Sequence, residues 1–66
     1  MLNANALRAE IARNGLTQGQ VAARIGMSAT TFSNKMNNNG FGIKEADKLI
    51  ELLGIQNPGA IFFGDE

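Results

Sequence analysis

A short helix expected over residues 29–37 carries small hydroxyl and amide side chains on one side. Counted at about 100° per residue from the apolar Phe32, this outer side holds Thr30, Asn34 and Asn37. Exposed helix surfaces usually carry Glu, Lys, Arg and Gln, which favour helix formation, whereas Thr and Asn favour it weakly. Something other than helix stability therefore selected this side, whose groups can donate and accept hydrogen bonds.

The charges are unevenly distributed along the chain, although six basic and six acidic residues give a net charge of zero. Zero net charge by itself argues against nucleic acid as a partner, because phosphate neutralisation supplies most non-specific affinity. Between Glu10 and Glu45 there is no acidic residue, and this basic window contains Arg13, Arg24, Lys35 and Lys44. The window surrounds the polar helix side, with chance in a short chain as the alternative explanation.

The composition excludes several kinds of chemistry. Cys and His are absent, which excludes disulfides, Cys/His zinc sites, thiol nucleophiles and imidazole bases. Glu45, Asp47 and Glu51 fall in one expected helix, but they lack a cluster of basic partners, metal-like spacing or a glycine-rich phosphate loop. We therefore expect no enzyme, no metal and no cofactor.

A chain of 66 residues has room for one domain, near the lower limit at which a hydrophobic core alone stabilises a fold. Its apolar clusters fall well short of the roughly 20 residues that a membrane span needs, and its first residues lack the layout of a signal peptide. We expect a single domain over residues 1–66, with no membrane partner and, without a sensor domain, no small-molecule ligand.

Two helices are expected before the polar one. The first lies within residues 1–14 and ends at Gly15. The second begins with the capping box Thr-Gln-Gly-Gln of residues 17–20 and ends at Gly26, where glycine can adopt a positive φ. Their inward residues are expected to be Leu7, Ile11 and Ala12 in the first helix and Val21, Ala22 and Ile25 in the second.

The polar helix follows the cap residue Ser28 and ends in the turn-forming residues 37–40, with Phe32 and Met36 toward the core. A helix over residues 43–53 has the strongest amphipathic pattern in the chain. Its inward residues are expected to be Ala46, Leu49, Ile50 and Leu53.

A short terminal helix is expected to begin at Asn57 and Pro58 and to end at Phe62 or Phe63. One of these phenylalanines is expected in the core, and the other would form a subunit interface with Ile61. Five helices without a strand pattern predict an all-α fold.

The central residues resemble the helix-turn-helix of the lambda-repressor-like (Cro/CI, XRE) DNA-binding domains. Counted from Gln18, that motif has Ala at its fifth and Gly at its ninth position, with apolar residues at the fourth, eighth, tenth and fifteenth. The matching residues here are Ala22, Gly26, Val21, Ile25, Met27 and Phe32. The five-helix layout also fits, so the resemblance covers nearly the whole chain.

Two residues depart from the commoner family pattern. Lys35 occupies the eighteenth position, which is usually apolar, and Asn37 stands where many members have Glu. The segment from Phe32 to Ile43 is nonetheless similar to a phage-encoded branch of the family, as is the ending Ile-Phe-Phe of residues 61–63.

The resemblance implies a compact five-helix lambda-repressor-like domain with its helix-turn-helix at about residues 18–37. It implies a sequence-specific transcriptional regulator, a Cro- or CI-like repressor of a phage or prophage, in the cytoplasm of a bacterial cell or phage-infected host. Helix 29–37 would enter the major groove of operator DNA and exclude polymerase by occupancy. It also implies a homodimer, through Ile61, Phe62 and Phe63.

The resemblance assigns base reading to the start and outer side of the polar helix, which here are Ala29, Thr30, Ser33 and Asn34. Asn can pair with adenine, hydroxyls bond to several base edges, and Ala or a Thr methyl can contact a thymine methyl. Gln18 matches the glutamine that clamps a phosphate at a helix N-terminus. The other candidates for phosphate contact are Ser28, Thr31, Lys35, Asn37, Asn38 and Asn39.

Structural roles are the alternative for several of these residues. Thr17 and Gln18 could simply cap a helix, and residues 37–39 could serve only the turn. Lys35 could lay its stem over the core with its amine in water. The alternative for the whole chain is a protein-interaction module, antirepressor-like or antitoxin-like, on the same fold, which the zero net charge favours.

Overall fold

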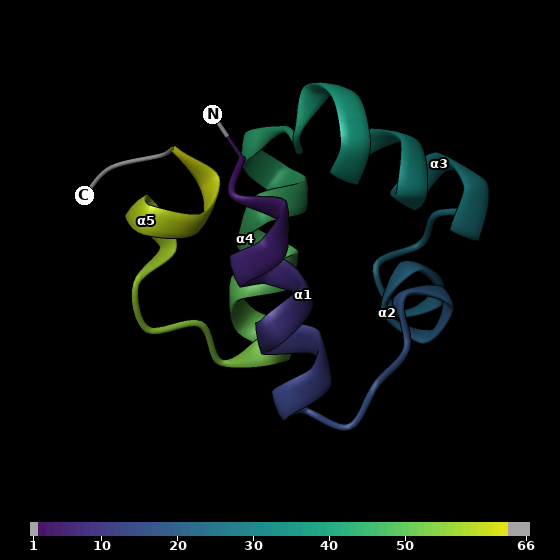
Figure 1. Ribbon diagram of the computed structural model, residues 1–66. Coiled ribbons are helices and arrows are strands. Elements are labelled where there is room, and N and C mark those ends of the chain that lie inside the picture. The colour runs from purple at the N-terminus through teal and green to yellow at the C-terminus, as the bar shows by residue number, and fades with distance from the viewer. Residues whose placement is uncertain (1, 64–66) are drawn as a thin grey trace.

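The computed structural model describes residues 2–63, and all regular secondary structure in this part of the chain is helical, as predicted. The elements are α1 (Ala4–Arg13), α2 (Gln18–Arg24), α3 (Ala29–Asn34), a π-helical turn (Lys35–Asn39), α4 (Ile43–Leu53) and α5 (Pro58–Phe62). In Figure 1, α1 and α4 occupy the centre, with α2 and α3 on one side and α5 on the other. No described helix is long and apolar enough to cross a membrane.

The predicted caps of α2 and α3 are present. Thr17 N donates to Gln20 Oε1 at 2.9 Å, and Gln20 N donates to Thr17 Oγ1 at 3.1 Å, which completes the capping box. Ser28 Oγ accepts from Thr31 N at 3.1 Å at the start of α3. Between the two helices the chain reverses at Gly26, whose φ of 81° disfavours a side chain. These local bonds fix the bounds of the α2–α3 hairpin, residues 18–34.

The core lies between the inner sides of all five α-helices. The largest side chains that are less than 2% exposed are Phe32, Leu7, Leu49, Leu53 and Val21. The inward residues predicted for α2 are all buried, whereas Ala12 of α1 is exposed and Ile50 of α4 is half-buried. The Cα radius of gyration is 10.5 Å, close to the roughly 11 Å of a compact chain of this length.

Polar contacts fasten α1 to the second half of the chain. The side chains of Arg13 and Asn14 both donate to the carbonyl oxygen of Leu53, at 2.8 and 3.0 Å. At the other end of α1, Asn3 N donates to the carbonyl oxygen of Ile61 at 2.7 Å. These bonds join α1, α4 and α5 in one frame.

The prediction of one α-helix over residues 29–37 is wrong in its second half. The α-helix ends at Asn34 and continues as the π-helical turn, in which Gly40 N donates to the carbonyl oxygen of Lys35 at 2.8 Å. That bond spans five residues, as in a π-helix, where an α-helix would span four.

Side-chain spacing explains the wider turn. Met36 follows Phe32 by four residues, but the next aromatic, Phe41, follows Met36 by five. Met36 is buried, and the Phe41 ring packs on Phe32 with centroids 5.1 Å apart. One turn with the five-residue π spacing brings both Met36 and Phe41 to the core.

The expectation that one of the two phenylalanines at the end of α5 lies in the core is confirmed. Phe62 is buried and Phe63 is 62% exposed, so one of the two phenylalanines belongs to the core. Ile61, which was expected at a subunit interface, is buried within the protomer.

Two substitutions on α4 test this packing. Leu49→Ala should lower the free energy of unfolding by about 2–5 kcal/mol, because it removes a fully buried side chain. Ile43→Ala on the same helix, at a position that is 77% exposed, should change it by less than about 0.5 kcal/mol. Urea unfolding followed by circular dichroism measures both, and equal effects would contradict the described core.

Candidate nucleic-acid interface

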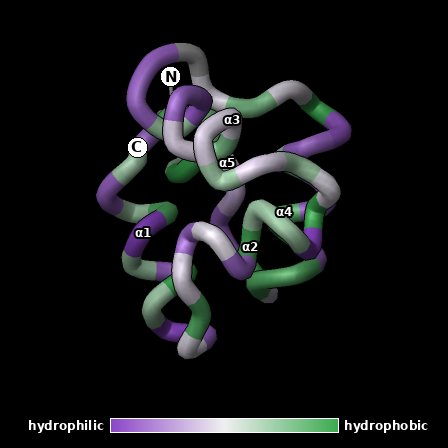
Figure 2. Tube along the Cα trace, turned by 90° about the vertical axis from the view of Figure 1, so that its right-hand side faces the viewer, coloured by the Kyte–Doolittle hydropathy of each residue, from purple (hydrophilic) through white to green (hydrophobic). Residues whose placement is uncertain are grey.

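The outer side of α3 is open to solvent. Ala29, Thr30 and Asn34 are exposed and Ser33 is half-buried, while Phe32 faces the core. The side chains of Thr30 and Asn34 form no hydrogen bond with any other residue in the described range 2–63. Figure 2 shows the molecule from the side on which α2 and α3 lie. The hydroxyl and amide groups of Thr30 and Asn34 are therefore available to an external partner.

Ser28 and Thr31 form a hydroxyl pair at the start of α3. Ser28 Oγ donates to Thr31 Oγ1 at 2.9 Å while it accepts from Thr31 N. Because the Ser28 proton is used in this bond, the Thr31 hydroxyl keeps its own proton for a further acceptor. Both residues were predicted to contact phosphate, and Thr31 is the one of the two whose hydroxyl proton is not used within the pair.

Gln18 is the first residue of α2 and is half-buried. The capping role falls to its neighbours Thr17 and Gln20, whose side chains form the reciprocal bonds. Of the two roles considered for Gln18, capping is therefore carried out by other residues, and phosphate contact stays a prediction.

Lys35 lies against α4. Its Nζ is 3.1 Å from Glu45 Oε1, and the same oxygen accepts from Gly42 N at 2.9 Å. Mainly through the Gly42 hydrogen bond, and with help from the Lys35 ammonium, the pKa of Glu45 is lowered from its ordinary value of 4.5. The carboxylate therefore joins the π turn to the N-terminus of α4, where the helix dipole favours an anion.

Asn37 and Asn38, in the π turn, are both exposed. Asn37 Oδ1 accepts from an Nη of Arg8, on α1, at 3.2 Å. The side chain of Asn39 lies outside the described part of the structure. The predicted phosphate contacts of these three residues stay predictions.

The basic window of the sequence is not one basic surface. Arg13 pairs with Glu10 and bonds to the end of α4, and Lys35 pairs with Glu45. Arg24 shares a shallow hollow with Lys48 and Glu51, on the α4 side of α2. Acidic residues at the two ends of the window thus offset part of its charge, which the linear sequence does not reveal.

Sequence reasoning missed Arg8 and the partner of Lys35. Arg8 lies outside the basic window of the sequence, and only the packing of α1 brings its guanidinium to the π turn. Glu45 was considered as the end of the basic window and as one of three carboxylates in its helix, and its contact with Lys35 depends on how the π turn meets α4. Neither contact has a local signal, because each joins separate elements.

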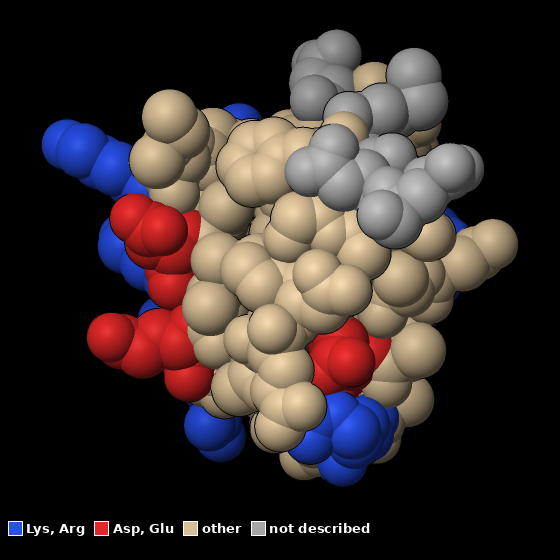
Figure 3. Space-filling model, turned by 90° about the vertical axis from the view of Figure 1, so that its left-hand side faces the viewer, with Lys and Arg blue, Asp and Glu red and all other residues tan. Residues whose placement is uncertain are grey.

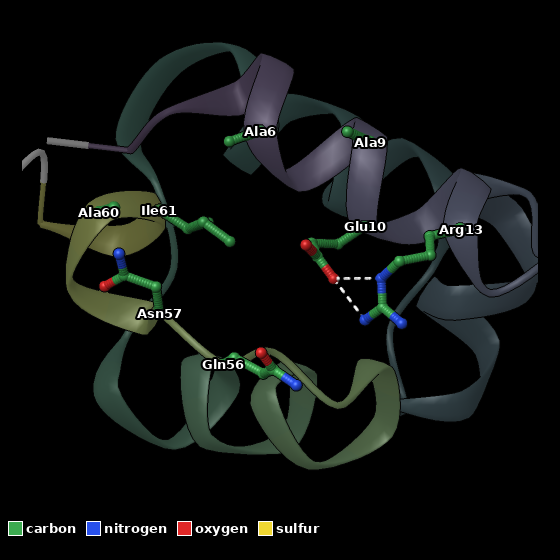
Figure 4. Close-up of a pocket in the computed structure, with 8 residues that line it drawn as sticks. All are labelled: Ala6, Ala9, Glu10, Arg13, Gln56, Asn57, Ala60 and Ile61. Atoms are coloured by element: carbon green, nitrogen blue, oxygen red, sulfur yellow. Dashed lines mark hydrogen bonds and ion pairs between the residues drawn. The ribbon is translucent and has the colours of Figure 1, made fainter.

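A second hollow lies on the side of α1 that faces α5. It has a volume of about 520 Å³ and is bordered by α1, the α4–α5 loop and α5 (Figure 4). The lining residues are Ala6, Ala9, Glu10, Arg13, Gln56, Asn57, Ala60 and Ile61. Its two charged side chains, Glu10 and Arg13, are paired with each other. The described residues contain no group of three or more carboxylates that could hold a metal.

Comparisons of the chain with models of known protein families, with curated proteins and with solved structures found no match. The function must therefore be inferred from the residues of the site.

The Glu45 contacts predict a pH-dependent contribution to stability. Because the folded pKa of Glu45 is lowered, the stabilisation is present above its ordinary value and is lost as the pH falls through the lowered one. Glu45→Gln should lower the free energy of unfolding by up to about 1 kcal/mol at pH 7, and the difference from the wild type should be smaller at pH 3. Urea unfolding at both pH values measures it.

Glu51→Gln is the matched control on the same helix. Glu51 is exposed and forms no ion pair within residues 2–63, so its substitution should change stability little at either pH. A Glu45→Gln effect that stays constant between the two pH values would contradict the described contacts.

Proposed function

We propose that the protein binds double-stranded DNA in a sequence-specific way and regulates transcription. The observation that supports this most is the outer side of α3, where Thr30 and Asn34 are exposed and without hydrogen-bond partners in the described structure. The opposite side of the same helix is fixed by Phe32, which is fully buried. A rigid helix with free hydroxyl and amide groups suits the major groove, which admits an α-helix and exposes donors and acceptors.

Each polar group of α3 has a plausible partner on a base edge. Asn34 can accept from adenine N6 and donate to N7, and Thr30 and Ser33 can donate or accept. Ala29 and the Thr30 methyl can contact a thymine methyl. Thr31, with its free hydroxyl proton, and Gln18 would bind the flanking phosphates and set the orientation of the helix.

The family proposed is that of the lambda-repressor-like regulators, with a Cro- or CI-like repressor of a phage or prophage as the specific role. The motif spacing from Gln18 to Phe32 supports it, and so does the order of five short helices. The protein would act by occupying its operator and excluding polymerase. No enzymatic activity is proposed.

Few unpaired charges lie near this interface, so the proposed DNA binding should have a distinctive salt dependence. Lys35 already has a carboxylate partner, so a phosphate would have to replace Glu45. Neutral donors on α3 release no counterions when they bind. The affinity should therefore depend less steeply on salt than that of a strongly basic domain, and more on base contacts.

A homodimer is part of the proposal, because a module of this size contacts one half-site. Of the three residues expected at the interface, Ile61 and Phe62 are buried in the protomer, and Phe63 is the exposed one. Phe63 would then be the side chain that meets the second copy.

The second candidate function is a protein-interaction module. Figure 3 shows the face on the α5 side, where uncharged residues cover most of the described surface and an acidic and a basic group lie side by side in its lower part. The exposed Phe63 belongs to the chain end next to α5. An exposed aromatic ring beside a surface with few charges favours a protein partner, which could be a second copy or another protein.

Asn34→Ala tests the assignment of base reading. Binding sites are first selected from random DNA, and affinities for the selected site and for random DNA are then measured by gel shift. Loss of one bidentate pair should weaken binding to the selected site by about 5- to 150-fold, corresponding to about 1–3 kcal/mol, and should leave random DNA nearly unaffected.

Asn57→Ala is the matched control, because Asn57 is exposed before α5 and makes no capping bond. It should leave both affinities unchanged. Equal losses of Asn34→Ala on selected and random DNA would contradict base reading. A wild-type protein that binds no DNA at low salt would favour the protein-interaction module.

Phe63→Ser tests the dimer. It should shift the protein toward the monomer in analytical ultracentrifugation and weaken binding to a palindrome with half-sites about 34 Å apart. Affinity for an isolated half-site should stay the same. A variant with unchanged oligomeric state would exclude Phe63 from the interface.

A further inference from the structure

Arg8 belongs to α1 but reaches the end of the hairpin. Its guanidinium donates to Asn5 Oδ1, one turn earlier on α1, and to Asn37 Oδ1 in the π turn, both at 3.2 Å. Arg8, Asn5 and Asn37 are all exposed. A cation from a separate element is therefore held beside the turn that follows the proposed reading helix.

The partners of Arg8 distinguish it from Arg13 and Lys35, the two cations near the hairpin that form ion pairs. Arg13 and Lys35 are each paired with a carboxylate. Arg8 forms no ion pair within residues 2–63, and both of its hydrogen-bond partners there are neutral amide oxygens. Its full positive charge is thus directed to solvent, although the guanidinium is held at two points.

We infer that Arg8 binds a phosphate of the DNA backbone next to the groove that α3 reads. This inference rests on the proposed function and extends the interface from the hairpin to α1. A guanidinium has five N–H donors in a planar fork, and the two amide bonds leave donors of this fork for an oxygen pair. Phosphate oxygens match the fork geometry and complement the charge.

Asn37 acts here as a positioning residue. Its Oδ1 accepts from Arg8, and its side-chain NH2 donates to no other residue in the described range 2–63. The contact orients a flexible arginine before DNA arrives, which reduces the side-chain entropy lost on binding. Arg8 and Asn37 would then contact the backbone as a unit.

Arg8→Gln is the direct test, with Arg24→Gln as a matched control. The control removes the same charge from the hollow that Arg24 shares with Lys48 and Glu51. Loss of one phosphate contact should lower the slope of log affinity against log salt by about 0.9, which is a roughly 3.5-fold difference between 50 and 200 mM salt. The loss should be equal for the selected site and random DNA. Arg24→Gln should leave the slope unchanged.

Two further variants separate charge from geometry. Arg8→Lys should keep the salt slope, because the charge remains, but should bind less tightly than wild type, because the fork is lost. Asn37→Ala should weaken binding in the wild-type background. In the Arg8→Gln background its effect should be smaller, since the two residues act together.

The outcomes distinguish this inference from the function on which it rests. If the wild type binds DNA and Arg8→Gln, with native helix content by circular dichroism, has the wild-type slope, Arg8 makes no phosphate contact. If Arg8→Gln does not fold, Arg8→Lys decides, and a wild-type affinity of that variant overturns the inference. If the wild type binds no DNA at low salt, the proposed function fails and the inference falls with it.

Discussion

The burial of Phe32 is the constraint on which the candidate interface depends. Six residues are too few to form a stable isolated helix, so α3 owes its existence to the cap at Ser28 and to packing. Phe32 is fully buried, and the ring of Phe41 lies 5.1 Å from it. With this side chain fixed in the core, the rotation of α3 is fixed as well. Thr30 and Asn34 then face solvent as a result of packing on the opposite side.

Around this helix, hydrogen-bonding groups outnumber unpaired charges. Glu45 offsets the charge of Lys35 and at the same time holds the π turn to α4. Phosphate contacts set affinity and orientation, whereas base contacts set specificity. A surface with few unpaired cations makes fewer phosphate contacts and so loses part of the affinity, but it retains the base contacts that set specificity. Zero net charge over the whole chain is compatible with such a division, although it does not require it.

The sequence predicted those features that depend on neighbouring residues. The bounds of α4 follow from its apolar spacing and from Gly54 after it, and the starts of α2 and α3 follow from capping side chains. The π turn was missed because its polar residues resemble a simple turn, and the five-residue step to Phe41 becomes meaningful only once Phe41 is known to pack on Phe32. The contact between Arg8 and Asn37 joins residues 29 apart, so it depends on how two helices pack, which local patterns do not encode.

The π turn has a consequence for how this chain is compared with other sequences. Relative to an α-helix, a π turn accommodates one additional residue without breaking the chain of hydrogen bonds. Residues after Met36 are therefore shifted by one position against any protein that continues as a plain α-helix. The step from Phe32 to the buried Met36 is the ordinary four residues, so the shift first affects the five-residue step from Met36 to Phe41. An ungapped alignment through residues 35–39 would pair inward residues with outward ones, and a single insertion there would restore the match.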